Sequence, residues 1–196
     1  MTTHHVIVYE VPGADPATHR IVTEHSDHRT TLVAADPSAI VAAAVDAADR
    51  GADRIELCGG LGPVWQARVR AAVGERVPVG AVMFGFESLA GAAHYQARYG
   101  TEPLRSAFLY LQPGADPEVD RTVVDGEHDR SYLVAVPDPA AAPAVAAHLV
   151  DTEGVQLLEL YGGFDPTDVA RVIDAIDARA PVGFPSYGYP APPPRA

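Results

Sequence analysis

The sequence contains no lysine and no asparagine, so all 14 of its basic side chains are arginines. The absence of lysine excludes a Schiff-base enzyme, a pyridoxal-phosphate anchor and the lysine of a phosphate-binding P-loop. Cysteine occurs once, at Cys58, which excludes an intrachain disulfide and a multi-cysteine zinc or iron–sulfur site. We therefore expect a protein that works without a cofactor and without a bound metal.

Long apolar runs and clusters of basic residues are also missing. No stretch approaches the roughly 18 apolar residues that a membrane span needs, and no basic segment followed by an apolar one marks a secretory signal. The 26 acidic residues outnumber the basic ones and give a net charge of −12, which repels a nucleic-acid backbone. We expect a cytoplasmic protein with a small-molecule ligand and with no nucleic-acid or membrane partner; a homodimer is left open.

What the sequence does contain is an internal repeat. Several motifs of the first half recur in the same order in the second half, about one hundred residues later, a period too long for a solenoid. The matched segments are 9–16 with 110–117, 32–34 with 133–135, 56–60 with 159–163, and 78–80 with 181–183. The matches predict a repeat one over residues 1–101, a repeat two over 102–189 and a proline-rich extended tail over 190–196.

Each repeat shows the same alternation of strands and helices. In repeat one, strands are predicted at 5–11, 30–35, 54–58 and 77–84, and helices at 36–50, from Pro63 onward and at 87–99. The pattern predicts an α/β fold with mainly parallel strands. Eight such strands favour a compact (βα)8-like barrel made of two halves. The alternative is two packed four-stranded α/β layers about a pseudo-twofold axis.

Two phrases of repeat one carry a family resemblance. Pro-Gly-Ala-Asp-Pro-x-x-His-Arg spans residues 12–20, and Ile-Glu-Leu-Cys-Gly-Gly-Leu-Gly-Pro spans residues 55–63. With these phrases the chain resembles a tandem duplication of a small, single-copy bacterial protein family of unknown function. The resemblance implies an α/β fold and no settled activity.

The main candidates for chemistry are Glu56 and its counterpart Glu159, each placed inside an apolar strand. A carboxylate there is costly to bury unless it is paired, hydrogen-bonded or protonated, and burial raises its pKa toward the range of a general acid or base. The structural alternative is that each glutamate pairs with an arginine, for example with one of Arg54, Arg68 and Arg171, or accepts hydrogen bonds from backbone amides.

Other candidates lie near the carboxyl ends of the strands, where parallel α/β folds bind ligands. Tyr161 is predicted as a catalytic partner of the glutamates. Cys58 could be a nucleophile near a helix start, although a buried inert thiol is favoured. The expected substrate-binding residues are Tyr9, Tyr110, Cys58, Met83, Phe84, Ser186 and Tyr187.

Three further motifs have plain structural interpretations beside the functional ones. Gly59-Gly60 could expose amides to an anion, and residues 24–28 (Glu-His-Ser-Asp-His) could bind a metal, but a solvated loop is favoured for the latter. Aspartates that precede a proline, at positions 15, 36, 116 and 138, are predicted to cap helices.

These observations favour a cofactor-independent isomerase, cyclase or lyase that uses a strand-borne glutamate on a small, largely apolar, oxygen-bearing metabolite. One alternative is a non-catalytic small-molecule-binding protein whose glutamates are structural. A second alternative is a metal-assisted hydrolase that uses the histidine-rich segment.

Overall fold

The computed structural model describes residues 2–188, so the predicted tail at 190–196 lies outside the described residues. One sheet of ten strands forms the centre, and its order is β2-β3-β1-β4-β5-β10-β9-β6-β8-β7. Repeat one contributes β1 (Thr3–Glu10), β2 (Arg20–His25), β3 (His28–Ala35), η1 (Pro37–Ala39), α1 (Ile40–Asp49), β4 (Arg54–Leu57), α2 (Pro63–Val73), β5 (Val79–Phe84), η2 (Phe86–Ser88) and α3 (Leu89–Arg98). Repeat two contributes β6 (Leu104–Leu111), β7 (Arg121–Asp125), β8 (Asp129–Val136), α4 (Ala142–Asp151), β9 (Leu157–Tyr161), α5 (Pro166–Ala175) and β10 (Val182–Ser186).

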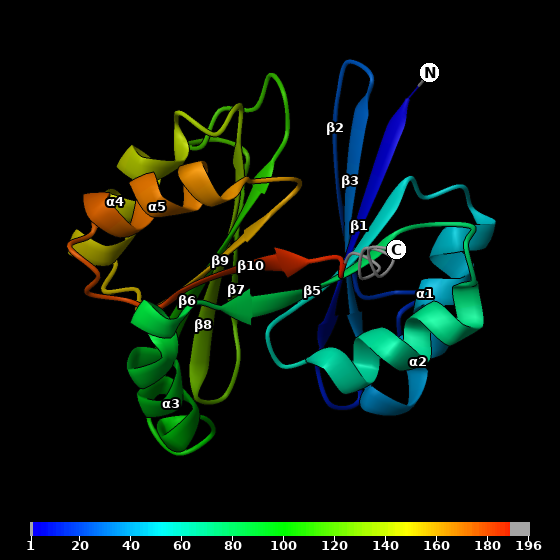
Figure 1. Ribbon diagram of the computed structural model, residues 1–196, viewed down its shortest axis with the longest axis horizontal. Coiled ribbons are helices and arrows are strands. Elements are labelled where there is room, and N and C mark those ends of the chain that lie inside the picture. Colours follow the sequence, from blue (N-terminus) through cyan, green and yellow to red (C-terminus); the bar gives the residue numbers. More distant parts are fainter. Residues whose placement is uncertain (1, 189–196) are drawn as a thin grey trace, which may run out of the picture.

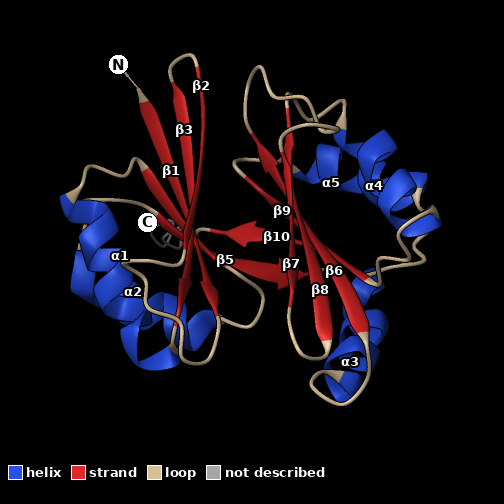
Figure 2. Cartoon of the chain, turned by 180° about the vertical axis from the view of Figure 1, so that it is seen from behind, coloured by secondary structure: helices blue, strands red, loops and turns tan. Residues whose placement is uncertain are grey.

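The sheet folds over so that its two halves face each other. Helices α1 and α2 cover the outer side of the repeat-one half, and α4 and α5 cover that of the repeat-two half (Figure 1). Strands β5 and β10 pair antiparallel in the middle and join the halves, as Figure 2 shows from behind. The inner faces pack together, because one buried apolar cluster contains Ile7 and Leu32 of repeat one with Leu133 and Tyr161 of repeat two.

The α/β class, the mainly parallel strands and the two repeats are confirmed, but the closed (βα)8-like barrel is wrong. Strands β2 and β7 end the sheet at opposite edges, and the pairing of β5 with β10 is antiparallel, so no ring of parallel strands forms. The alternative of two packed layers is closer to the structure. Each layer has five strands rather than four, however, and the layers are halves of one continuous sheet.

The fifth strand of each repeat lies in a segment that we expected to be a long connection. β2 and β3 form an antiparallel hairpin, and β7 and β8 form its counterpart. The turn of the first hairpin places Ser26 in the left-handed region, at φ 52°. The alternation of residues 20–25 was the available signal, and it was weak because polar side chains occupy both of its faces.

The aspartate–proline pairs act as caps, but only some of them begin helices. Asp36 accepts a hydrogen bond from the Ser38 N–H and begins the short helix that leads into α1. Asp165 forms a complete capping box at the start of α5. The Asp15 side chain accepts from the Ala17 N–H inside a turn, and Asp116 does the same in repeat two, so these two aspartates cap turns rather than helices.

Candidate functional site

Both candidate glutamates lie at the interface between the two halves of the sheet. Glu56 is fully buried, and its Oε2 accepts a hydrogen bond of 2.8 Å from the backbone N–H of Gly162. Its Oε1 accepts one from the hydroxyl of Tyr187. The Nε2 atom of His5 lies 2.7 Å from Glu56 Oε2, at ion-pair distance but without hydrogen-bond geometry. Glu56 is thus held by groups from β1 and from repeat two.

Glu159 occupies the equivalent place in repeat two and reaches in the opposite direction. The backbone N–H of Gly59 lies 3.1 Å from Glu159 Oε1 and 3.2 Å from Oε2. The hydroxyl of Tyr161, on the same strand face, donates to Oε2. Gly59 and Gly162 are themselves equivalent in the two repeats. The carboxylates therefore cross over, each accepting from the glycine of the other repeat.

The surroundings of the two carboxyl groups push their pKa values apart. Burial alone would raise the pKa of Glu56, but the His5 ring, the Tyr187 hydroxyl and the Gly162 N–H outweigh it and hold that pKa below its ordinary value. Within the described residues Glu159 has no cationic partner, so burial outweighs its hydrogen bonds from Tyr161 and Gly59 and raises its pKa to about 7. Around neutral pH, Glu56 is ionised and Glu159 is close to half protonated.

Neither glutamate forms an ion pair with an arginine within residues 2–188, and each accepts a backbone N–H, which is the second form of the structural alternative that we considered. The hydroxyl donors come from two positions that differ between the repeats. Tyr187 stands where repeat one has Phe84, and Tyr161 stands where it has Cys58. Phe84 and Cys58, the residues at these positions in repeat one, have no hydroxyl group to donate.

The remaining predicted residues divide into two groups. Cys58, Met83 and Phe84 lie with the glutamates at the junction, and burial beside Glu159 raises the pKa of the Cys58 thiol to about 12, as an inert thiol requires. Tyr9 and Tyr110 lie on strands that neighbour those of the glutamates: Tyr9 is close to the Cys58 thiol, and Tyr110 is the register partner of Tyr161. Tyr9 packs against the core, the Tyr110 hydroxyl lies 2.9 Å from Thr23 Oγ1, and Ser186 is exposed.

Neither of two hollows within residues 2–188 is lined by Glu56 or Glu159. The Gly59 backbone and the ring of Phe84 fill the space beside Glu159. The shared pocket near the pseudo-twofold axis stays a prediction, and both carboxyl groups have hydrogen-bond partners within the protein. Their contacts link the two halves of the sheet.

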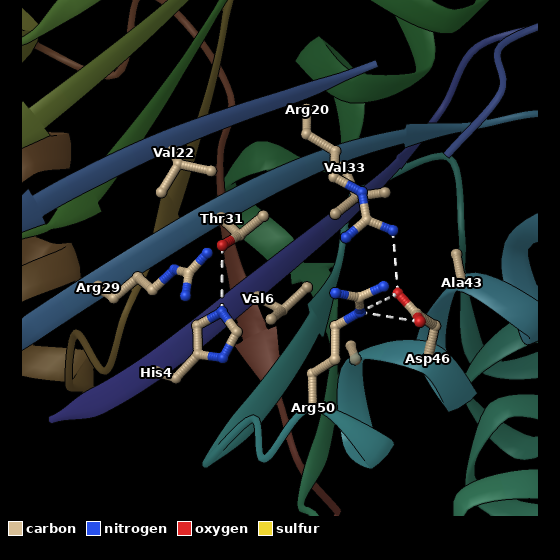
Figure 3. Close-up of a pocket in the computed structure, with 11 residues that line it drawn as sticks. His4, Val6, Arg20, Val22, Arg29, Thr31, Val33, Ala43, Asp46 and Arg50 are labelled. Atoms are coloured by element: carbon tan, nitrogen blue, oxygen red, sulfur yellow. Dashed lines mark hydrogen bonds and ion pairs between the residues drawn. The ribbon is translucent and has the colours of Figure 1, made fainter. Parts of the chain in front are cut away.

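A hollow does open elsewhere, on the outer side of repeat one. It has a volume of about 140 Å³ and lies between α1 and the outer faces of β1, β2 and β3. Arg20, Arg29 and Arg50 border it together with His4 and the single carboxylate of Asp46 (Figure 3). We refer to it as the arginine hollow.

The polar groups of the arginine hollow are partly linked to one another. Asp46 lies between two of the arginines, with Oδ2 2.9 Å from the Arg20 Nη2 and from the Arg50 Nε. The Nε2 of His4 lies 3.0 Å from Thr31 Oγ1. Burial, with Arg29 nearby, lowers the pKa of His4, so its ring is neutral at pH 7. Three guanidinium groups and one carboxylate therefore line the hollow, and two further carboxylates lie beside it, because Glu24 pairs with Arg29 and Asp53 accepts from the His4 backbone.

The equivalent place in the described part of repeat two carries larger side chains. The small side chains of Thr31, Ala43 and Ala47 correspond to Tyr132, Val145 and Leu149. Tyr132 and Leu149 are buried there and fill the equivalent space. Asp46 and Arg50 correspond to His148 and Thr152, so the charges are also different.

Sequence reasoning missed the arginine hollow because its residues come from four separate elements. Arg20 and Arg29 stand in a segment that we expected to be a long connection, and Arg50 stands at the predicted end of a helix. A comparison of the two repeats could have revealed the arginine hollow. On the helix that follows the matching Asp-Pro pair, alanines of repeat one correspond to larger apolar residues of repeat two. The predicted metal-binding segment, residues 24–28, spans the turn of the first hairpin. Within residues 2–188 no group of three potential metal ligands comes together, so the structure does not support a metal site.

The fold and its sites define a class of α/β proteins in which two copies of one unit share a single folded sheet. The chain belongs to the family of unknown function DUF6506, whose model matches it twice, at residues 3–97 and 104–191. The double match confirms the tandem duplication. No helix within the described part of the chain combines the length and the apolar character needed to cross a membrane.

Similar solved structures include proteins that bind small molecules. A carbohydrate transporter from Acidothermus cellulolyticus in complex with myo-inositol is 13% identical, with a TM-score of 0.29, and the match covers 94% of this chain and 74% of that one. The arabinose-binding protein AraP from Geobacillus stearothermophilus is 15% identical, with a TM-score of 0.31 and coverages of 91% and 71%. No curated protein matches the sequence. At these TM-scores the likeness carries no argument about function.

Proposed function

We propose that the protein binds a small anionic molecule in the arginine hollow of repeat one. The observation that carries this proposal is the contrast between the repeats: one copy keeps an open hollow bordered by three arginines, and the other fills the same place with Tyr132 and Leu149. A space that one copy closes with ordinary core residues is not required by the fold. Its retention beside three cations favours a ligand.

The chemistry of the lining indicates a phosphate or carboxylate group. Arginine presents a planar fork of donors that matches both anions, and a neutral His4 paired with the Thr31 hydroxyl adds further polar contacts. Asp46 already occupies donors of Arg20 and Arg50, whereas among residues 2–188 Arg29 pairs only with the exposed Glu24, at 3.2 Å. Valine and alanine side chains form the rest of the wall.

The size of the hollow limits the ligand. Pockets for drug-sized molecules enclose roughly 300 to 1,000 Å³. About 140 Å³ suits an inorganic anion or a metabolite of a few carbons, and it excludes a complete nucleotide. The net charge of −12 opposes the approach of anions over the surface as a whole, which makes a local cluster of arginines necessary.

Calorimetric titration of the full chain with inorganic phosphate, and separately with succinate, tests the proposal. Arg29→Gln should weaken binding of the better anion by at least about tenfold, because a charge-assisted contact is lost. Arg130→Gln is the matched control, since Arg130 is the equivalent residue of repeat two and pairs with Asp125 as Arg29 pairs with Glu24. Equal affinities in the two variants, or no binding of either anion, would count against the proposal.

A second variant separates shape from charge. Ala47→Leu copies the residue of repeat two into the arginine hollow and changes no charge. It should abolish binding while the far-ultraviolet circular dichroism and the melting temperature stay close to those of the parent. Undiminished binding by this variant would place the ligand elsewhere.

A second candidate function, acid–base catalysis as an isomerase, cyclase or lyase, is favoured by one observation. Glu159 has a pKa near 7 and contacts Tyr161, whereas Glu56 stays ionised beside Tyr187. Two carboxyl groups with separated pKa values are a feature of acid–base sites. Glu159→Gln and Glu56→Gln test it against a substrate that the parent turns over, and full activity in both variants would dismiss it.

A further inference from the structure

The two outer strands of the sheet have unpaired edges. β2 and β7 end the ten-stranded sheet, and within residues 2–188 neither has a second strand beside it. Just outside the two ends of β7, the Asp120 carbonyl accepts from the Ala135 N–H, and the Gly126 N–H donates to the Asp129 carbonyl. Because hydrogen-bonded and non-hydrogen-bonded pairs alternate along an antiparallel ladder, every second residue of β7 bonds to β8. The residues between them, Arg121, Val123 and Asp125, therefore direct their N–H and C=O groups outward.

The side chains of these three residues form a pattern that is complementary to itself. If a second β7 runs antiparallel about a twofold axis at Val123, Arg121 of each strand faces Asp125 of the other, and the two Val123 residues meet in the centre. Opposite charges directly across an antiparallel pair are favourable, and so is contact between β-branched side chains. The outward backbone groups of all three residues find partners in this register.

The two edges differ on one face only: Val22 of β2, at 46%, is slightly more exposed than its counterpart Val123, but Val124 of β7 is more exposed than the equivalent Thr23. Val123 and Val124, which point to opposite faces of the strand, are 41% and 36% exposed. β2 carries a similar order of charges, but Ile21 and Thr23 are partly covered, and its Thr23 and His25 already contact Tyr110 and Asp120. Proteins usually protect a free edge with lysine, proline or a bulge, and residues 121–125 contain neither lysine nor proline.

We propose that two copies of this chain associate through antiparallel pairing of their β7 strands, with Arg121 of one copy opposite Asp125 of the other. The proposal concerns a surface on repeat two and is independent of ligand binding in repeat one.

The start of β7 lies near β2. A groove of about 340 Å³ is lined by residues of β2, by Tyr110 and by residues 119–122, and His25 contacts Asp120 at 3.1 Å. Arg121 pairs with Glu153 and Asp125 with Arg130. A guanidinium has five donors and a carboxylate accepts several hydrogen bonds, so both existing pairs can persist beside the new ones.

Two short strands bury less area than the roughly 1,200 Å² of a standard stable interface. We therefore expect a weak dimer that forms at high protein concentration, and sedimentation equilibrium of the full chain over a wide range of concentrations should detect it. A single monomeric species at millimolar concentration would overturn the proposal.

Charge exchange tests the register. Asp125→Arg alone places two arginines opposite each other and should weaken dimerisation by at least about tenfold. The double variant Arg121→Asp with Asp125→Arg restores complementarity and should recover the parent's dimerisation to within about threefold. Circular dichroism checks that each variant is folded. A double variant as weak as the single one, or a single variant as strong as the parent, contradicts this register.

Cysteine cross-linking locates the contact independently of charge. Two strands paired at Val123 hold their Cα atoms about 5.5 Å apart, within the range of a disulfide. Val123→Cys should therefore give a covalent dimer on mild oxidation, while the native Cys58 is buried and does not compete. Val22→Cys on β2 is the control. Cross-linking of Val22→Cys but not of Val123→Cys would place the contact at β2 and not at β7, and it would overturn the proposal.

Discussion

The carboxylate of Glu56 accepts a hydrogen bond of 2.8 Å from the backbone of Gly162, a residue of the other repeat. Glu159 repeats this contact in reverse with Gly59. The two contacts lie beside the antiparallel pair of β5 and β10, so they fasten the halves where the sheet turns over. Removing the backbone N–H that a buried carboxylate accepts lowers the free energy of unfolding. Small changes at this junction should therefore destabilise the protein.

Gly59→Ala should destabilise the protein strongly. A Cβ at position 59 would lie 2.2 Å from Glu159 Oε1, so the carboxyl group would have to leave its place and its N–H donor. We expect the free energy of unfolding to fall by about 2 to 4 kcal/mol in urea titrations.

Gly60→Ala is the matched control for that substitution. A Cβ at Gly60 meets nothing within 4 Å, so its effect should stay within about 1 kcal/mol. Equal losses at the two positions would show that backbone freedom, and not the approach to Glu159, decides the effect.

Glu159 should make stability depend on pH in the neutral range. Its folded pKa of about 7 lies above the ordinary value of 4.5, so between these two values the folded state binds more protons than the unfolded state. The contribution of Glu159 is full below pH 4.5 and is lost as the pH rises through 7. This contribution of Glu159 to the free energy of unfolding is on the order of 3 kcal/mol.

Urea titrations of the parent and of Glu159→Gln between pH 5 and 8 measure this contribution. The free energy of unfolding of the parent should fall across that interval, and that of Glu159→Gln should change much less, because glutamine does not titrate. Parallel curves for the two proteins would mean that Glu159 is ionised throughout. Glu56 has the opposite sign: its lowered pKa gives stability that is lost as the pH falls below its ordinary value.

Tyr187→Phe should remove one hydrogen bond from the buried Glu56 carboxylate while it keeps the ring. Hydrogen bonds to charged groups contribute roughly 1.5 to 3 kcal/mol, so we expect a loss of about 2 kcal/mol in the free energy of unfolding. Tyr99→Phe serves as the comparison, since the Tyr99 side chain is 54% exposed and its hydroxyl can bind water. An equal, small effect of both variants would argue against a role of Tyr187 at the junction.

Leu149→Ala and Ala47→Leu exchange the equivalent residues of the two repeats. Removing the buried Leu149 side chain leaves a cavity and should cost about 2 to 5 kcal/mol of stability. Adding the same atoms at Ala47 fills the arginine hollow and should cost less than about 1.5 kcal/mol. Thermal unfolding of both variants measures the difference, and a large loss for Ala47→Leu would mean that the arginine hollow is too narrow for a leucine side chain.

The sequence alone determined the duplication, the α/β class and the burial of both glutamates. These follow from local patterns: recurring motifs, alternating strands and helices, and acidic residues inside apolar runs such as 55–57 and 158–160. The strands at 20–25 and 121–125 were missed because a hairpin edge with polar side chains on both faces gives no clear period.

Only the tertiary structure decided what the glutamates contact and where a hollow remains. Strand periodicity fixes the face on which Glu56 lies, but the backbone amide that it meets belongs to a loop 106 residues away. The same holds for the arginine hollow, because Arg20, Arg29 and Arg50 converge only when β2, β3 and the end of α1 are packed together. Contacts between distant segments depend on how the sheet folds over, and local residue preferences do not carry that information.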